Sequence, residues 1–131
     1  MGPAKILVVD DDADIRRIAG LALERLGGFR VTLAADGAEA IARASQDRPD
    51  LVLLDVSMPE FDGPATLATL RAQEATAGVP VVFFTATSND AEVARLIALG
   101  AVGVVPKPFE VGDLPRRVRV ILEDLGYTEG P

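Results

Sequence analysis

The 131-residue chain contains neither cysteine nor histidine. Without cysteine there is no disulfide framework, no thiol nucleophile and no soft metal site. Without histidine, any bound metal must be held by oxygen ligands, which favours Mg²⁺, Mn²⁺ or Ca²⁺. Catalysis by serine–histidine or cysteine–histidine pairs is excluded as well. Metal or acid–base chemistry in this chain therefore depends on carboxylates, hydroxyls and amines.

Basic residues and long apolar runs are also scarce. Thirteen lysines and arginines face 20 acidic residues, which gives a net charge of −7 and no basic stripe for nucleic acid or anionic membranes. No apolar run approaches 18 residues, and we find no signal peptide before the first apolar run. We therefore expect a cytoplasmic protein that contacts neither nucleic acid nor membrane directly.

The apolar residues, 49% of the chain, are grouped in five short runs that alternate with helical patterns. Most runs lack polar alternation, as is typical of strands covered on both faces. Strand–helix alternation predicts right-handed βαβ units, and so an α/β fold with an open parallel sheet between two helical layers. We expect one domain at residues 4–126, a short tail at 127–131 and no output domain. The runs are Lys5–Asp10, Phe29–Ala34, Leu51–Asp55, Val79–Thr85 and Val102–Pro106.

Two amphipathic stretches predict the first and last helices, which end at Gly27 and Gly126. Leu21 points about 120° away from the apolar face of the first helix by the helical period. We therefore expect Leu21 to be exposed, as part of a partner surface beside Asp14 and Arg17. The residues expected to face the core are Ile15, Ile18, Ala19, Ala22 and Leu26 in the first helix and Leu114, Val118, Ile121, Leu122 and Leu125 in the last.

Three consecutive aspartates, Asp10, Asp11 and Asp12, follow the first strand. Two unit charges about 4 Å apart repel by about 4 kcal/mol at an effective dielectric near 20, so such a cluster raises a carboxylate pKa or recruits a cation. One acid is enough to cap the next helix, and Asp12 fits that role. We predict a cation site built from Asp10 and Asp11.

Three more polar side chains follow the other strands, and ligands of parallel sheets bind at this edge. Asp55 alone also fits a turn, but beside the first cluster it predicts a third oxygen ligand or a carboxylate nucleophile. Thr85 suits a strand and also offers a hydroxyl to an anion. Lys107 lies between Pro106 and Pro108, which fix its backbone, and the Lys107–Pro108 bond is left open as cis or trans.

Together these groups suit phosphoryl transfer, because a divalent ion and an ammonium neutralise phosphoryl oxygens near a nucleophilic carboxylate. The chain has no glycine-rich phosphate loop, so a nucleotide is not the expected donor.

The ordered motifs resemble the receiver domain of two-component response regulators over about residues 4–125. The resemblance implies a flavodoxin-like (βα)5 fold with strand order 2-1-3-4-5. Any one motif is weakly specific, whereas all four in this order are highly specific. They are Ile6-Leu-Val-Val-Asp10-Asp11, Leu53-Leu-Asp55-Val-Ser-Met-Pro59 with Asp62-Gly63, Phe84-Thr85-Ala86, and Val105-Pro-Lys107-Pro-Phe109.

The resemblance also implies a role for each site residue. Asp55 would accept a phosphoryl group from a phosphohistidine on a sensor histidine kinase or histidine phosphotransfer protein. Asp11, Asp55 and the main-chain carbonyl of Ser57 would bind Mg²⁺ directly, with Mn²⁺ as the alternative, and Asp10 would act mostly through water. Thr85 and Lys107 would contact the phosphoryl oxygens.

By the same resemblance, phosphorylation would draw Thr85 toward the phosphate and rearrange the surface of the fourth helix, fifth strand and fifth helix for a target that the sequence does not identify. Because the chain has no histidine, its donor is expected in trans.

The sequence departs from the family pattern on the fifth strand. Val104 stands where an aromatic switch residue is common, which argues against a readout by a rotating ring. Pro106 removes a backbone donor, which an edge strand tolerates. Ser57 and Thr87 are small hydroxyl residues at positions that influence acyl-phosphate lifetime in the family.

Two other functions are compatible with parts of the pattern. A haloacid-dehalogenase-like phosphohydrolase would use Asp10 and Asp12 as its D-x-D motif. It needs a further acidic pair at a strand end after the lysine, where the next acids, Glu110 and Asp113, open a helix, and commonly a cap domain. A constitutive receiver-fold binding module would need no phosphorylation, although such modules usually lose one of the acidic residues. The main interpretation is a signalling phospho-acceptor rather than an enzyme acting on other substrates.

Overall fold

The computed structural model describes residues 2–86 and 89–127. Five parallel strands form one sheet in the order β2-β1-β3-β4-β5, as expected. The strands are β1 (Lys5–Val9), β2 (Arg30–Ala34), β3 (Leu51–Asp55), β4 (Val81–Thr85) and β5 (Gly103–Pro106). The helices are α1 (Ala13–Leu21), continued by the π-helical turn η1 (Ala22–Leu26), α2 (Gly37–Gln46), α3 (Gly63–Ala72), α4 (Asp90–Ala98) and α5 (Asp113–Asp124).

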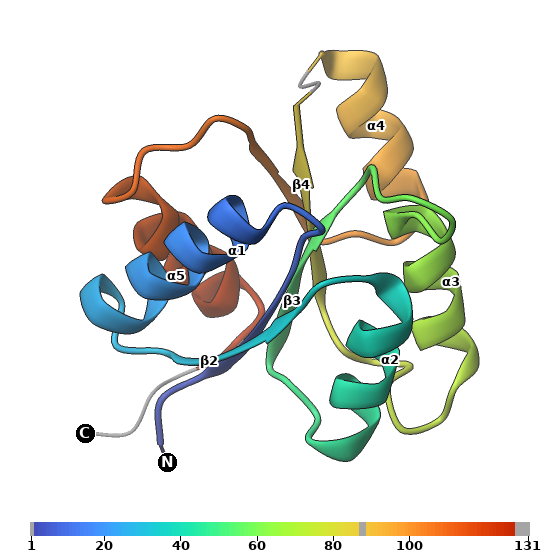
Figure 1. Cartoon of the computed structure of the whole chain (residues 1–131), viewed down its shortest axis with the longest axis horizontal. Helices are drawn as coiled ribbons and strands as arrows, with labels where there is room; N and C mark the ends of the chain where they lie inside the picture. The colour runs from blue at the N-terminus through green and yellow to red at the C-terminus, as the bar shows by residue number, and fades with distance from the viewer. Residues whose placement is uncertain (1, 87–88, 128–131) are drawn as a thin grey trace.

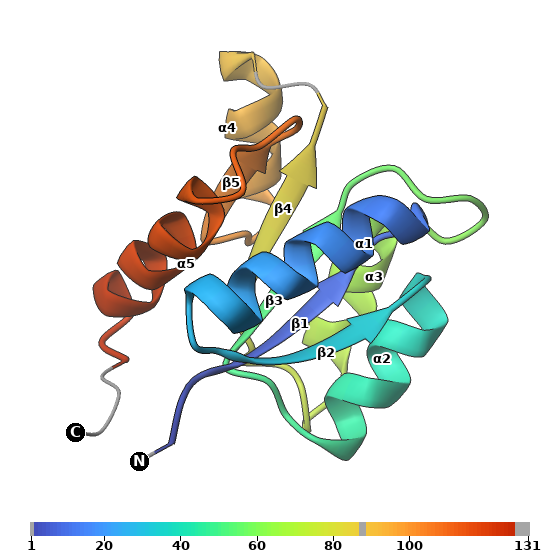
Figure 2. The same cartoon turned by 60° about the vertical axis from the view of Figure 1, so that its left-hand side comes forward.

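The sheet is covered on both faces, with α1 and α5 on one side and α2, α3 and α4 on the other (Figures 1 and 2). Two apolar clusters fill the two interfaces. Along β1, Ile6 and Val8 pack into the cluster under α1 and α5, whereas Leu7 and Val9 pack into the other. Because neighbouring strand residues point to opposite faces, a continuous apolar run can serve both layers.

The order of the strands reverses at β1, which pairs with β2 on one side and with β3 on the other. Val9 lies opposite Ala34 of β2 and opposite Leu54 of β3. The residues that follow Val9 and end β3 therefore lie together at the carboxyl edge, at the switch point where open α/β sheets bind ligands.

The five strands predicted from sequence are confirmed within two residues at each end. Coverage on both faces does not extend to β2, however. Arg30, Thr32 and Leu33 are exposed, because β2 is an edge strand and pairs with β1 on one side alone. Pro106 lies at the other edge, on β5, as expected from its missing N–H.

The expected core face of the first helix is partly wrong. Ala19 and Ala22 are buried together with Leu23, but Ile18 is 43% and Leu26 is 63% exposed. The helix changes to a π-turn at Ala22, and the wider turn shifts the phase of the residues after it, which moves Leu26 out of the core. A sequence pattern of period 3.6 does not contain that shift.

The last helix matches its expected face at Leu114, Val118 and Leu122, whereas Leu125 is 45% exposed. Tyr127, the first residue of the expected tail, is joined to the domain: its N–H donates to the Leu122 carbonyl at 2.9 Å, and it packs against the core cluster under α1 and α5. Residues 128–131 of the expected tail lie outside the described residues. No helix within residues 2–86 and 89–127 is long and apolar enough to cross a bilayer.

Candidate phosphoryl-acceptor and metal site

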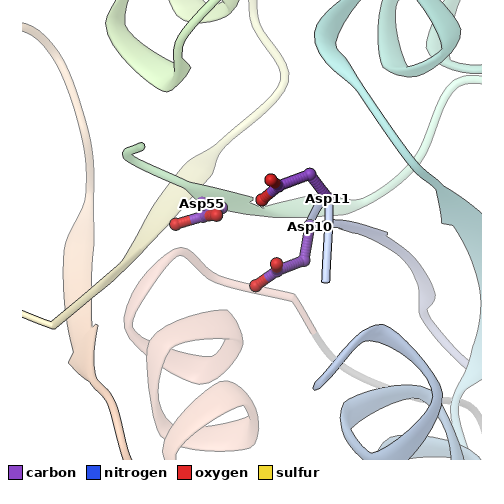
Figure 3. Close-up of side chains that lie close together, drawn as sticks. All are labelled: Asp10, Asp11 and Asp55. Atoms are coloured by element: carbon purple, nitrogen blue, oxygen red, sulfur yellow. The ribbon is translucent and has the colours of Figure 1, made fainter. Parts of the chain in front are cut away.

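Asp10, Asp11 and Asp55 converge at the carboxyl edge, where the ends of β1 and β3 lie side by side (Figure 3). One carboxylate oxygen from each lies within 4.8 Å of the others. Asp10 is fully buried and Asp55 is 5% exposed, whereas Asp11 is exposed. The sheet topology thus brings together acids that are 45 positions apart in the chain, as the strand-end pattern predicted.

The backbone after β1 is fixed by hydrogen bonds to Asp10. The Asp12 N–H donates to Asp10 Oδ1 at 2.9 Å, and Arg16 Nη1 donates to the Asp10 main-chain carbonyl at 2.7 Å. The Asp10 N–H remains in the sheet, where it donates to the carbonyl of Ala34 at 3.2 Å. Asp10 is therefore held through its backbone and its side chain.

Asp12 is the N-cap of α1, as expected from its position. Its Oδ1 accepts from the N–H groups of Asp14 at 2.9 Å and Ile15 at 3.2 Å. This contact satisfies donors that have no partner inside the helix. The third aspartate thus stabilises the helix and is separate from the converging group of carboxylates.

Lys107 joins the acidic group from the end of β5. Its Nζ lies 2.7 Å from Asp10 Oδ2 and 3.1 Å from Asp55 Oδ1, and 5.5 Å from the centroid of the Phe84 ring. The Lys107 N–H donates to the Thr85 carbonyl at 2.8 Å, and the Lys107–Pro108 bond is cis. Among the described residues, buried Asp10 Oδ2 has no hydrogen-bond partner beyond this ion pair.

The crowded charges change the pKa values of Asp55 and Lys107. Burial, and then the charge of Asp10, raises the pKa of Asp55 to about 6, although Lys107 and the Ser57 N–H oppose the rise. Burial alone would lower the pKa of Lys107, but the contacts with Asp10 and Asp55 raise it above its ordinary value. Lys107 is therefore a fixed cation, and Asp55 ionises fully only above the usual range for an aspartate.

The loop after β3 packs tightly against Asp55. The Ser57 N–H donates to Asp55 Oδ1 at 3.3 Å, and the Gly63 N–H donates to the Val56 carbonyl at 2.9 Å. A Cβ atom on Gly63 would lie 2.4 Å from the Asp55 carbonyl oxygen, closer than any side chain allows. Only glycine lets α3 begin against the end of β3.

The remaining predicted residues lie around the same edge. Thr85 ends β4, is 4% exposed and lies opposite Pro106 of β5. Val104 is half-buried on β5 and packs against the cluster that also contains residues of α3 and α4. Leu21 is 42% exposed, as expected, although Ile18 is exposed to the same degree. Thr87 lies outside the described residues.

The donor set fits a small hard cation. All candidate ligands are oxygens, and octahedral Mg²⁺ sites place ligand oxygens about 3 Å apart when adjacent and about 4.2 Å apart when opposite. The three carboxylates, within 4.8 Å of one another, need only a small closure to reach such distances. Both Asp10 oxygens are already engaged, by Asp12 and Lys107, which leaves Asp11 and Asp55 freer to bind the ion.

The fold and the edge together define a doubly wound α/β protein with three converging carboxylates at its switch point. The chain belongs to the response regulator receiver domain family, whose sequence profile matches residues 6–119. This membership gives the chain a role in two-component signalling.

Named relatives agree with the family. The transcriptional regulatory protein PrrA of Mycobacterium tuberculosis is 42% identical over 125 residues, which are 95% of this chain and 52% of that protein. The probable transcriptional regulatory protein TcrX of the same species is 39% identical over 128 residues, 96% of this chain and 53% of that protein. The chain thus spans about half the length of these relatives.

Among solved structures, the chemotaxis protein CheY4 of Vibrio cholerae superposes with a TM-score of 0.85 and 32% identity. The superposition covers 92% of this chain and 100% of CheY4. The likeness supports the five-stranded order and the arrangement of helices.

Sequence reasoning identified the converging carboxylates and Lys107 but missed three supporting contacts. These are the hydrogen bond from Arg16 to Asp10, the close packing of Gly63 and the Phe84 ring beside Lys107. Gly63 carried a signal, because it stands in the Asp62-Gly63 motif, whereas Arg16 looks like any polar residue of a helix.

Proposed function

We propose that Asp55 accepts a phosphoryl group from a phosphohistidine of a sensor histidine kinase or histidine phosphotransfer protein. The observation that carries this proposal is the contact of Asp55 with Lys107, at 3.1 Å, beside the carboxylates of Asp10 and Asp11. A nucleophile, a fixed cation and an oxygen-only metal site are the parts that phosphoryl transfer requires.

In the proposed step, a carboxylate oxygen of Asp55 forms a bond to phosphorus while the phosphorus–nitrogen bond of the donor breaks. The electron pair of that bond returns to the imidazole of the donor. A bound Mg²⁺ would neutralise charge on the phosphoryl oxygens, held by Asp11, Asp55 and the main-chain carbonyl of Ser57, with Asp10 acting through water. Mn²⁺ offers the same chemistry.

The side chains of Lys107 and Thr85 serve the other phosphoryl oxygens. Lys107 enters the site as a cation, and once Asp55 carries the phosphoryl group as an acyl phosphate the Lys107 ammonium is available to a phosphoryl oxygen. Thr85 stands at the end of the neighbouring strand, where movement of its hydroxyl toward the phosphate would report the modification. The role of the chain is then that of a signalling acceptor that promotes only its own phosphorylation and dephosphorylation.

The consequence of phosphorylation is a change in the α4–β5–α5 surface, to which the downstream target binds. Added charge at Asp55 biases this element between two arrangements. Val104 has no aromatic ring that could rotate. The change would therefore be carried by the backbone and by repacking around this half-buried side chain.

The test is phosphate-affinity electrophoresis after incubation with acetyl phosphate and Mg²⁺. We expect a retarded band for the wild-type chain, and none for Asp55→Asn or in the presence of EDTA. No retarded band in the wild-type chain would instead support a constitutive binding module.

A phosphohydrolase is tested with p-nitrophenyl phosphate. Its D-x-D motif would make Asp10 the nucleophile, but Asp10 is fully buried and both of its carboxylate oxygens are engaged, by the Asp12 N–H and by Lys107, whereas Asp55 is 5% exposed. Rapid hydrolysis that is lost in Asp10→Asn and kept in Asp55→Asn would reverse the assignment.

A further inference from the structure

Arg16 and Arg17 are consecutive on α1 but differ in their environment. Arg16 is half-buried, and its Nη1 donates to the main-chain carbonyl of Asp10 at 2.7 Å. Arg17 is exposed and lies beside a shallow hollow against β2 that also includes Leu21 and Leu33. Of these two adjacent arginines, Arg16 is the one that contacts Asp10, the residue before Asp11.

The Asp10 carbonyl belongs to the peptide group that joins Asp10 to Asp11. The last paired residue of β1 is Val9, so the chain leaves the sheet at this peptide and turns toward α1. A charged donor at 2.7 Å fixes the orientation of the peptide plane more strongly than a neutral one. The direction in which the Asp11 side chain leaves the backbone depends on that plane.

Asp11 needs this support more than the other two acids do. Asp10 is held by Lys107 and by the Asp12 N–H, and Asp55 is held by Lys107 and by the Ser57 N–H. Asp11 is exposed and leans toward Asp55 from a loop rather than from a strand (Figure 3).

We propose that Arg16 is a positioning residue for the metal site: by binding the Asp10 carbonyl, it holds the β1–α1 loop so that Asp11 faces Asp55. This inference rests on the proposed metal-binding role of the carboxylates. It does not assign Arg16 to the metal, to the phosphoryl group or to a partner protein.

The sign of the effect distinguishes positioning from charge. Removal of a nearby positive charge, by itself, strengthens the binding of a cation. Loss of positioning weakens it, and groups that orient metal ligands typically account for about tenfold or more in affinity. Arg16→Met and Arg17→Met remove the same charge from adjacent positions, and only the first removes the hydrogen bond to Asp10.

The experiment is a calorimetric titration of the full chain with MgCl₂ alone, near pH 7.5. We expect the dissociation constant to rise about tenfold in Arg16→Met and to stay equal or fall slightly in Arg17→Met. Arg16→Lys, which keeps a charged donor, should recover part of the affinity. Equal or tighter binding in Arg16→Met than in Arg17→Met would overturn the proposal.

A second readout needs no metal. In the metal-free protein, Arg16→Met should shift the backbone amide resonances of Asp11 and Asp12, whereas Arg17→Met should leave them in place. If Arg16→Met does not fold, the same comparison between Arg16→Ala and Arg17→Ala decides, because alanine also removes the donor. Unchanged Asp11 and Asp12 resonances in the Arg16 variant would contradict the proposal.

Different results would contradict the proposed function and the proposed role of Arg16. If the wild-type chain neither binds Mg²⁺ nor becomes phosphorylated on Asp55, the metal-dependent role itself is wrong. If the wild-type chain does both and the two arginine variants behave alike, only the role of Arg16 is wrong.

Discussion

At the scale of single residues, the acidic edge is a balance of unfavourable and favourable charges. Burial and the charge of Asp10 raise the pKa of Asp55 to about 6, while Lys107 remains protonated between the two carboxylates. The ion pairs offset part of the repulsion but do not remove it. The metal-free site therefore stores unfavourable electrostatic energy that a cation can release.

This balance makes stability depend on pH. Because the pKa of Asp55 is raised from 3.8 to about 6 on folding, its contribution to stability is fully present below pH 4 and is lost as the pH rises through 6. In EDTA we expect Asp55→Asn to be more stable than wild type at pH 7.5, by about 1–2 kcal/mol, with a smaller difference at pH 4.5. Urea unfolding monitored by circular dichroism at both pH values measures the difference. A constant difference would mean that Asp55 ionises normally in the folded chain.

At the scale of elements, the site depends on how closely α3 approaches β3. Gly63 is the first residue of α3 and lies against the Asp55 carbonyl. The side chain of Asp62 caps the helix, because its Oδ1 accepts a hydrogen bond from the Ala65 N–H at 2.9 Å. The adjacent loop contains Glu60 with a φ of 66°, an uncommon conformation for a residue with a Cβ. A strand end, a strained loop and a helix start are thus packed into one unit around Asp55.

Substitution of Gly63 tests this unit. In Gly63→Ala the added Cβ would lie 2.4 Å from the Asp55 carbonyl oxygen and 2.9 Å from both Phe83 Cε1 and Val56 Cα, so the backbone must shift. We expect a loss of about 2–3 kcal/mol in the free energy of unfolding and slower phosphorylation by acetyl phosphate.

Gly112→Ala is the matched control, because a Cβ there meets nothing within 4 Å and the φ of −73° suits alanine. Urea denaturation should show little change for this variant. Equal stability of the two variants would contradict the packing argument.

At the scale of the whole molecule, metal binding and folding are linked. The carboxylates come from separate strands, so the unfolded chain does not assemble them, and an Mg²⁺ ion held by them would bind the folded state preferentially. At ten times the dissociation constant, a ligand of this kind adds about 1.4 kcal/mol to the free energy of unfolding.

We therefore expect MgCl₂ to raise the melting temperature of the wild-type chain by several degrees relative to EDTA. In Asp55→Asn, which has lost one of the proposed carboxylate ligands, the rise should be much smaller. Thermal unfolding monitored by circular dichroism provides the comparison, with NaCl at matched ionic strength as the control. An equal rise in both proteins would place the ion elsewhere.

The sequence by itself determined the fold class and most of the site. Apolar runs such as Leu51–Asp55 have the length and composition of buried strands, and the polar residues that follow them must share one edge once the sheet is parallel. The absence of histidine and cysteine restricted the metal ligands to oxygen. Local patterns suffice here because strand periodicity and strand ends are properties of short segments.

Only the tertiary structure decided which side chains support the site and which helix faces are buried. The π-turn after Leu21 moves Leu26 out of the core, and no local periodicity records that change. The hydrogen bond from Arg16 to Asp10 and the close approach of Gly63 to Asp55 depend on how helices settle against strand ends. Such contacts are set by the packing of the whole domain, which a residue-by-residue pattern does not contain.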